Sequence, residues 1–196
     1  MESFMKIGVL ALQGDFAEHI AVLKDLGAAA SEVRLPGHLD GLDGLIIPGG
    51  ESTTIGKLAV DFGLMEPLID FGEARPIWGT CAGAILLSKD VRRHQPLLGL
   101  MDITVERNAF GRQVDSFEAD LDIEPLKRAT ATSHPYHAVF IRAPIIESVS
   151  GTARILSKLP DGRIVAAQQG NLLATSFHPE LTADTRFHQY FLSLCG

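Results

Sequence analysis

Residues 77–84 read Ile77-Trp78-Gly79-Thr80-Cys81-Ala82-Gly83-Ala84, an apolar strand that leads directly into a cysteine and then into a helix. Glycines lie two residues before and two residues after the cysteine, where a sharp strand-to-helix turn needs small residues. This pattern is the cysteine version of the nucleophile elbow. The turn lifts Cys81 above the carboxyl edge of a sheet and places its sulfur at a helix N-terminus, where the dipole favours the thiolate. A structural cysteine in a tight turn is the competing interpretation.

The segments before this elbow alternate between short apolar strands and amphipathic helices. Phe16, Ile20 and Leu23 recur at helical spacing. Asp15 can cap that helix with Glu18 three residues on, and Gly27 stands where a helix-ending glycine is expected. Strands are predicted over 6–12, 31–35, 42–47 and 77–80, and helices over 15–26, 53–62 and 82–89. Alternation of this kind predicts a parallel sheet that is covered on both faces.

The second half of the chain changes character. Strands are predicted over 102–107, 113–121, 138–141, 154–159, 164–169 and 172–177, and a closing helix from Thr182. Residues 124–137 are the least regular stretch and are expected to form a surface loop. The whole pattern indicates an α/β fold in one domain over residues 1–196: a mostly parallel twisted sheet flanked by helices, with an antiparallel extension.

Composition narrows the function classes. Acidic residues number 24 and basic residues 17, so the net charge is −7, which argues against DNA or RNA as the main partner. No apolar run approaches the roughly 18 residues of a transmembrane helix. Two cysteines, Cys81 and Cys195, provide no disulfide framework. We expect a cytoplasmic protein with no nucleic-acid partner and no membrane partner.

A cysteine nucleophile needs a base, and the base needs a group that orients it. Among the seven histidines, His178 stands out in the segment Ser176-Phe177-His178-Pro179-Glu180, directly after an apolar strand. Side chains two residues apart in extended backbone point to the same side. Glu180 can therefore accept a hydrogen bond from one ring nitrogen of His178 and leave the other for Cys81. The competing interpretation is a capping pair at the start of the last helix.

The glycine pair in Pro48-Gly49-Gly50-Glu51-Ser52 follows another expected strand. Paired glycines let the backbone approach a ligand closely, and their free N–H groups can bind the oxyanion that thiol attack on an amide generates. A phosphate-binding loop fails on spacing, because that pattern needs glycine at Glu51 and serine or threonine at Leu58. A plain turn is the remaining alternative.

The other histidines and the second cysteine are weaker candidates. His134 and His137 lie in the expected loop with no cysteine or carboxylate cluster beside them in the sequence, so we predict solvated residues and no metal site. His19 and His188 fall on expected helices and are predicted to be surface or interface residues. Cys195, next to the C-terminus, has no partner group in the sequence.

Taken together, these motifs resemble a known family. Gly79-Thr80-Cys81-Ala82-Gly83 with His178-Pro179-Glu180 is similar to the class I (triad) glutamine amidotransferases, which have a flavodoxin-like fold. Further blocks resemble the glutaminase subunits of pyridoxal 5′-phosphate synthase and span nearly the whole chain: Leu12-Gln13-Gly14 with Glu18-His19, Pro48 to Thr54, Val105 to Asn108, Phe110 to Glu118, Phe140 to Pro144, and His178 to Thr182. The stretch over 126–137 departs from the family, being longer and less regular.

The resemblance implies a glutaminase without metal or cofactor that hydrolyses L-glutamine and passes the ammonia to a synthase subunit. Cys81 would be the nucleophile, His178 the acid and base, and Glu180 the group that holds the imidazole. Glutamine-binding positions carry over to Gly49, Gly50, Glu51, Arg107, Ile141 and Arg142, and the oxyanion hole to the N–H groups of Gly50 and Ala82. Two alternatives stay open: a glutaminase for another acceptor, such as imidazole glycerol phosphate synthase, or a non-catalytic α/β binding module.

Overall fold

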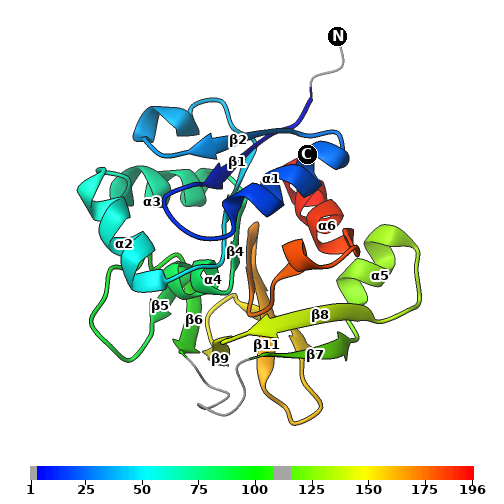
Figure 1. The fold of residues 1–196 in the computed structure, drawn as a ribbon. Helices are drawn as coiled ribbons and strands as arrows, with labels where there is room; N and C mark the ends of the chain where they lie inside the picture. The colour runs from blue at the N-terminus through cyan, green and yellow to red at the C-terminus, as the bar shows by residue number, and fades with distance from the viewer. Residues whose placement is uncertain (1–3, 108–115) are drawn as a thin grey trace.

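The computed structural model describes residues 4–107 and 116–196 (Figure 1). The α-helices are α1 (Phe16–Asp25), α2 (Ser52–Asp61), α3 (Met65–Ala74), α4 (Ala82–Leu87), α5 (Glu124–Thr130) and α6 (Arg186–Cys195), with short 3-10 helices η1 (Pro36–Leu39) and η2 (Pro179–Leu181). The strands are β1 (Lys6–Leu10), β2 (Ala29–Val33), β3 (Gly44–Ile47), β4 (Ile77–Thr80), β5 (Ser88–Asp90), β6 (Met101–Glu106), β7 (Ser116–Leu121), β8 (Tyr136–Ile141), β9 (Ile145–Val149), β10 (Arg154–Lys158), β11 (Ile164–Gln169) and β12 (Leu172–Thr175). Of the strand expected over 113–121, the first three residues lie outside the described part, as does the family-like stretch over 108–115.

The main sheet has the order β2-β1-β3-β4-β12-β11-β9-β6-β5, with β10 paired to β11. Neighbours from β2 through β12 run parallel, whereas β11 is antiparallel to β12, β10 and β9, and β9 is antiparallel to β6. The expected fold class, a mostly parallel sheet with an antiparallel extension, is confirmed. The carboxyl ends of β1, β3, β4 and β12 therefore meet at one edge of the sheet.

Each face of the sheet has its own apolar core, because successive strand residues point to opposite faces. In β3 and β4, Leu45 and Ile77 pack on the side of α2, α3 and α4. The next residues along, Ile46 and Trp78, pack with the aromatic residues of α6 on the opposite side. Figure 1 shows α2 and α3 on one side of the sheet and α1 and α6 on the other. Among the described residues, no helix combines the length and apolar character needed to cross a membrane.

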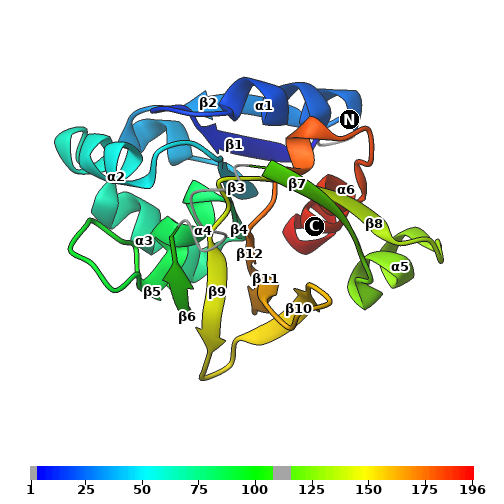
Figure 2. The ribbon, with the colours of Figure 1, turned by 60° about the horizontal axis from the view of Figure 1, so that its bottom comes forward.

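A second, two-stranded antiparallel sheet is formed by β7 and β8, and Figure 2 shows it beside α5 and apart from β9 and β11. The expected surface loop over 124–137 is wrong for its first half, where α5 forms and its Leu126 is buried, and for Tyr136 and His137, which begin β8. Pro125 stands in the first turn, where a missing N–H is harmless, and Ala131 ends the helix in the left-handed region. With a single buried side chain, so short a helix has no apolar periodicity to detect.

Other helix boundaries also differ from the sequence pattern. The closing helix begins at Arg186 rather than Thr182, because the side chain of Asp184 accepts the backbone N–H of Arg186 and holds a turn before it. The sequence pattern does not predict helix α3, since Pro67 and Gly72 interrupt it. Asp15 makes no capping hydrogen bond to α1, contrary to expectation, although Gly27 does follow that helix with φ of +84°.

Candidate active site

Cys81 stands between β4 and α4 in a conformation that few non-glycine residues adopt. Its φ is 50° and its ψ is −102°, and its N–H donates to the carbonyl oxygen of Thr175 on β12 at 2.8 Å. The flanking glycines are required by contact: a Cβ on Gly83 would collide with the carbonyl oxygen of Ile47, and one on Gly79 with the backbone of Gly83. Strain of this kind is typical of a nucleophile held on an elbow.

His178 and Glu180 lie at the end of the neighbouring β12 segment. The Nδ1 of His178 donates to Oε1 of Glu180 at 2.6 Å, and both residues are buried. A carboxylate only accepts, so the proton belongs to Nδ1 and the Nε2 of His178 is left for Cys81. The backbone N–H of His178 donates to the carbonyl oxygen of Val139 on β8 at 2.8 Å, which anchors the segment between the two sheets.

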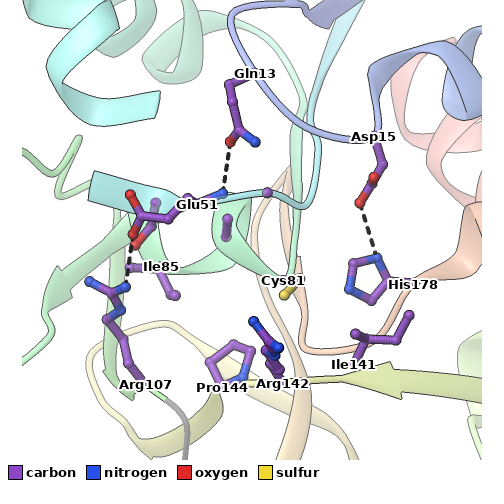
Figure 3. A pocket seen from close by; sticks show the side chains of 13 residues that line it. Gln13, Asp15, Glu51, Cys81, Ile85, Arg107, Ile141, Arg142, Pro144 and His178 are labelled. Atoms are coloured by element: carbon purple, nitrogen blue, oxygen red, sulfur yellow. Dashed lines mark hydrogen bonds and ion pairs between the residues drawn. The ribbon is translucent and has the colours of Figure 1, made fainter. Parts of the chain in front are cut away.

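Electrostatics favour a protonated His178. Burial by itself lowers the pKa of this imidazole, but the hydrogen bonds of its side chain with Cys81 and Glu180 outweigh burial and raise the pKa to about 10. An imidazolium next to a cysteine favours the thiolate form of that cysteine. Figure 3 shows the sulfur of Cys81 and the ring of His178 on the same side of one pocket.

Asp15, which follows β1, adds a second carboxylate to this histidine. Its Oδ2 lies 3.5 Å from the Nδ1 of His178 (Figure 3), and burial raises the pKa of its carboxyl. The ligand atoms of Asp15, His178 and Glu180 lie within 4.8 Å of one another, as in a metal site. The 2.6 Å between His178 and Glu180 is nevertheless a direct hydrogen bond, which leaves no room for an ion between them.

The pocket in front of Cys81 has a volume of about 490 Å³, enough for an amino acid. Its lining includes most of the residues singled out in the sequence: Gly50, Glu51, Cys81, Ala82, Arg107, Ile141, Arg142 and His178. It also includes Gln13, Asp15, Ser52, Ile85 and Pro144, which are not among the site residues expected from the sequence. The place of Asp15 in the site could have been found from its position just after the first strand of a parallel sheet.

Glu51 and Arg107 form an ion pair on one wall of the pocket. Nη2 of Arg107 donates to Oε1 of Glu51 at 2.9 Å, and Nη1 donates to Thr53. Burial tends to raise the pKa of Glu51, but hydrogen bonds from Thr54 and Thr53 at the start of α2 lower it to about 2. The wall therefore offers a carboxylate and a guanidinium together. Arg142, which directly follows β8 and has φ of 44°, lines the same pocket.

The loop that contains Gly49 and Gly50 is tied to the loop after β1. The N–H of Asp15 donates to the carbonyl oxygen of Gly49 at 3.0 Å, and the N–H of Glu51 donates to Oε1 of Gln13 at 2.8 Å. Gly49 itself lies against the imidazole, because a Cβ there would be 2.6 Å from Cε1 of His178. The glycine pair is thus packed beside the proposed base rather than forming a plain turn.

The structure also shows the surroundings of the histidines and the cysteine outside the proposed triad. His19 and His188 are not surface residues: both are fully buried. His137 has carboxylates on both sides, Asp120 and Glu118 at 2.9 Å each, because β7 pairs with β8. Cys195 donates to the carbonyl oxygen of Phe191, and burial raises the pKa of its thiol to about 12, so it stays protonated.

Comparison with known proteins agrees with this geometry. Residues 9–196 match the SNO glutamine amidotransferase family. The chain belongs to this family. It is 59% identical, over 97% of its length and 100% of the relative's, to "Pyridoxal 5′-phosphate synthase subunit PdxT" from Herpetosiphon aurantiacus. A protein of the same name from Moorella thermoacetica is 56% identical over 98% of this chain and all of the relative.

Solved structures place this SNO-family chain in the same fold. A crystal structure described as a glutamine amidotransferase superposes with a TM-score of 0.89 at 50% identity, covering 97% of this chain and 98% of the other. A putative subunit of GMP synthase from Thermoplasma acidophilum has a TM-score of 0.71 at 18% identity, covering all of this chain and 96% of the other. The second comparison supports the fold alone.

Proposed function

We propose that this chain hydrolyses L-glutamine to L-glutamate and ammonia through Cys81, His178 and Glu180. The observation that carries the proposal is that Cys81 and His178 line one pocket of about 490 Å³, while the buried Glu180 accepts a hydrogen bond from His178 at 2.6 Å. Membership of a glutamine amidotransferase family supports the substrate. The strained backbone at Cys81 supports its assignment as the nucleophile.

The chemistry follows from the protonation state of His178. The Cys81 thiolate attacks the side-chain amide carbon of glutamine, and the carbonyl oxygen becomes an oxyanion. Protonated His178 then gives its proton to the leaving nitrogen, ammonia departs, and a thioester remains on Cys81. Neutral His178 next takes a proton from water, which attacks the thioester and releases glutamate. Glu180 stabilises the imidazolium form and keeps the ring in place throughout.

The pocket walls are suited to the rest of the substrate. Arg107 and Arg142 can pair with the α-carboxylate, since a guanidinium fork matches a carboxylate, and Glu51 can accept from the α-ammonium group. Ile141 supplies an apolar wall, and the backbone of Gly49 can fix the side-chain amide. The N–H groups of Gly50 and Ala82 form the oxyanion hole in this proposal, with a contribution of roughly 3–4 kcal/mol per donor in comparable sites.

We further propose that ammonia passes to a synthase subunit that forms pyridoxal 5′-phosphate. The support is the printed name of the relatives from Herpetosiphon and Moorella, which are subunits of that synthase. We also propose that the protein acts in the cytoplasm, because Cys81 must stay reduced to act as the nucleophile and the cytoplasm keeps thiols reduced. Cys81 and Cys195 are both unpaired.

The test is ammonia release from L-glutamine by the purified chain, alone and mixed with a synthase subunit. We expect Cys81→Ala to abolish release and to leave the circular dichroism spectrum unchanged, because the elbow tolerates a small side chain. Cys195→Ala is the matched control and retains release, since its thiol lies outside the pocket. Turnover by Cys81→Ala above background would overturn the assignment, and no release by the parental chain under either condition would overturn the function.

A further inference from the structure

Two buried histidines lie in a row behind Glu180. His19 on α1 and His188 on α6 are both fully buried and pack edge-on against the ring of Trp78. Nδ1 of His19 lies 3.0 Å from Nε2 of His188, and Nε2 of His19 lies 3.4 Å from Oε2 of Glu180. The proposed mechanism assigns neither histidine a role. Their side chains nevertheless reach the carboxylate that orients His178.

Both imidazoles are neutral at neutral pH. Burial lowers the pKa of His188 to about 4, and burial together with His188 and His178 holds the pKa of His19 well below its usual range. A neutral imidazole has one N–H donor and one acceptor nitrogen. The pair therefore has two tautomeric arrangements, according to which histidine donates to the other.

In the first arrangement, His188 donates from Nε2 to Nδ1 of His19, and the Nε2–H of His19 faces the carboxylate of Glu180, 3.4 Å away. The single group left over is Nδ1 of His188, an acceptor that has no hydrogen-bond partner among the described residues. Oε2 of Glu180 has no hydrogen-bond partner in the described part of the chain, and it lies 3.4 Å from Nε2 of His19, as does the hydroxyl of Thr80. The free energy cost of this arrangement is therefore that of one buried acceptor without a donor.

In the second arrangement, His19 donates from Nδ1 to His188. Nδ1 of His188 then carries a buried proton with no acceptor, and the lone pair of His19 Nε2 faces the negative Oε2 of Glu180. The hydroxyl of Thr80, 3.4 Å from that Nε2, would be its remaining donor. The second arrangement therefore leaves two unfavourable groups, the Nδ1 proton of His188 and the His19 lone pair that faces Glu180, whereas the first leaves only Nδ1 of His188, so the first is favoured.

We propose that His19 is a positioning residue for glutamine hydrolysis: its Nε2–H holds Oε2 of Glu180, so that Oε1 stays on Nδ1 of His178. His188 fixes the required tautomer of His19. The inference rests on the proposed function. The N–H donors of His188 and His19 then both point toward the carboxylate of Glu180 from one side, and Nδ1 of His178 donates to it from the other.

Asp15 explains why the contact of His19 with Glu180 matters, and we call this contact the brace. Its carboxylate lies 3.5 Å from the same Nδ1 of His178 and is a competing acceptor. With Glu180 held by His19, the shorter bond of 2.6 Å to Glu180 sets the direction of the ring. Without the brace, Oε2 of Glu180 is a buried charge without a donor, Glu180 turns, and His178 shifts toward Asp15 and away from Cys81.

Three substitutions separate positioning from a merely structural role. His19→Leu keeps much of the volume and removes both nitrogens. His19→Gln is the conservative variant, since its amide can donate to Glu180 and accept from His188. Leu23→Ala is the matched control: Leu23 lies one turn further along α1 and is fully buried in the same core, so its loss weakens the fold without touching the row.

In ammonia release by the full chain with its synthase subunit, we expect His19→Leu to lower kcat by about 100-fold and leave KM within a few fold. His19→Gln recovers most of kcat. Leu23→Ala lowers the urea midpoint and retains kcat. Parental kcat in His19→Leu, or an equal loss in Leu23→Ala, would overturn the inference while leaving the proposed function intact. Turnover by Cys81→Ala would instead overturn the proposed function.

A spectroscopic measurement on the parental chain decides the tautomers even if His19→Leu does not fold. Long-range ¹H–¹⁵N correlation spectra of histidine-labelled protein distinguish a protonated Nε2 from a protonated Nδ1. We expect His19 and His188 to be neutral at pH 7 with the proton on Nε2, and His178 to carry a proton on Nδ1. A proton on Nδ1 of His19 would refute the proposal directly.

Discussion

Gly49→Ala tests how closely the glycine loop is fitted to the base. The backbone of Gly49 is not in the left-handed region, so alanine adopts its conformation without strain. The added Cβ would, however, lie 2.6 Å from Cε1 of His178 and 3.1 Å from Oδ2 of Asp15. Carbon atoms in contact keep about 3.5–4.0 Å. The imidazole or the loop must therefore move by about 1 Å.

Either movement impairs the chemistry. A retreat of the ring weakens its bond to Glu180 and changes its distance to Cys81, whereas a retreat of the loop displaces the N–H of Gly50 from the oxyanion. A misplacement of 1 Å lowers the rate by about 100-fold, which corresponds to about 2.7 kcal/mol of transition-state stabilisation. We expect this loss in kcat, with a smaller change in KM, because the binding groups of Glu51 and Arg107 are untouched.

The assay is steady-state ammonia release together with the urea midpoint of each variant. Gly37→Ala is the matched control, because a Cβ at Gly37 meets no atom within 4 Å and its φ is not positive. That control retains kcat and stability. A folded Gly49→Ala variant with parental kcat would refute the reasoning, since it would mean that His178 is not confined by this loop. A rise in KM alone would assign Gly49 to binding and not to the base.

Four further outcomes are expected. Glu180→Gln lowers kcat less than Cys81→Ala does, because an amide still accepts from His178 but stabilises the imidazolium less; parental turnover would make Glu180 dispensable. Arg107→Ala raises KM for glutamine more than it lowers kcat, and an unchanged KM would remove Arg107 from the binding site. The synthase subunit raises kcat more than it lowers KM, because the oxyanion forms only after attack; equal kcat in the free and complexed chain would mean a preformed hole. The folded-state pKa of His188, about 4, lies below the ordinary 6.5, so its contribution to the free energy of unfolding is full above pH 6.5 and falls by roughly 3 kcal/mol as the pH falls toward 4. In urea titrations at several pH values, the free energy of unfolding of His188→Leu therefore falls less steeply below pH 6.5 than that of the parental chain. An equally steep fall in both proteins would contradict the assignment.

Local sequence was sufficient wherever the physical cause is itself local. The elbow around Cys81 could be predicted because the turn requires small neighbours, and Gly79, Ala82 and Gly83 provide them. The pairing of His178 with Glu180 could be predicted from their two-residue spacing, but the extended backbone assumed for it is wrong, because Pro179 and Glu180 lie in the 3-10 helix η2. The parallel sheet follows from strand–helix alternation, and with it the meeting of the Gly49 loop and Cys81 at one edge.

Tertiary structure alone decided the surroundings of these groups. Helical periodicity finds an apolar face, but a histidine is compatible with either face, so the burial of His19 and His188 emerges only where α1 and α6 pack against Trp78. Asp15 would cap α1 by local rules, yet in the fold it faces a residue 163 positions away, because β1 and β12 end at the same edge. Such long-range pairings depend on strand order, which short-range spacing does not encode.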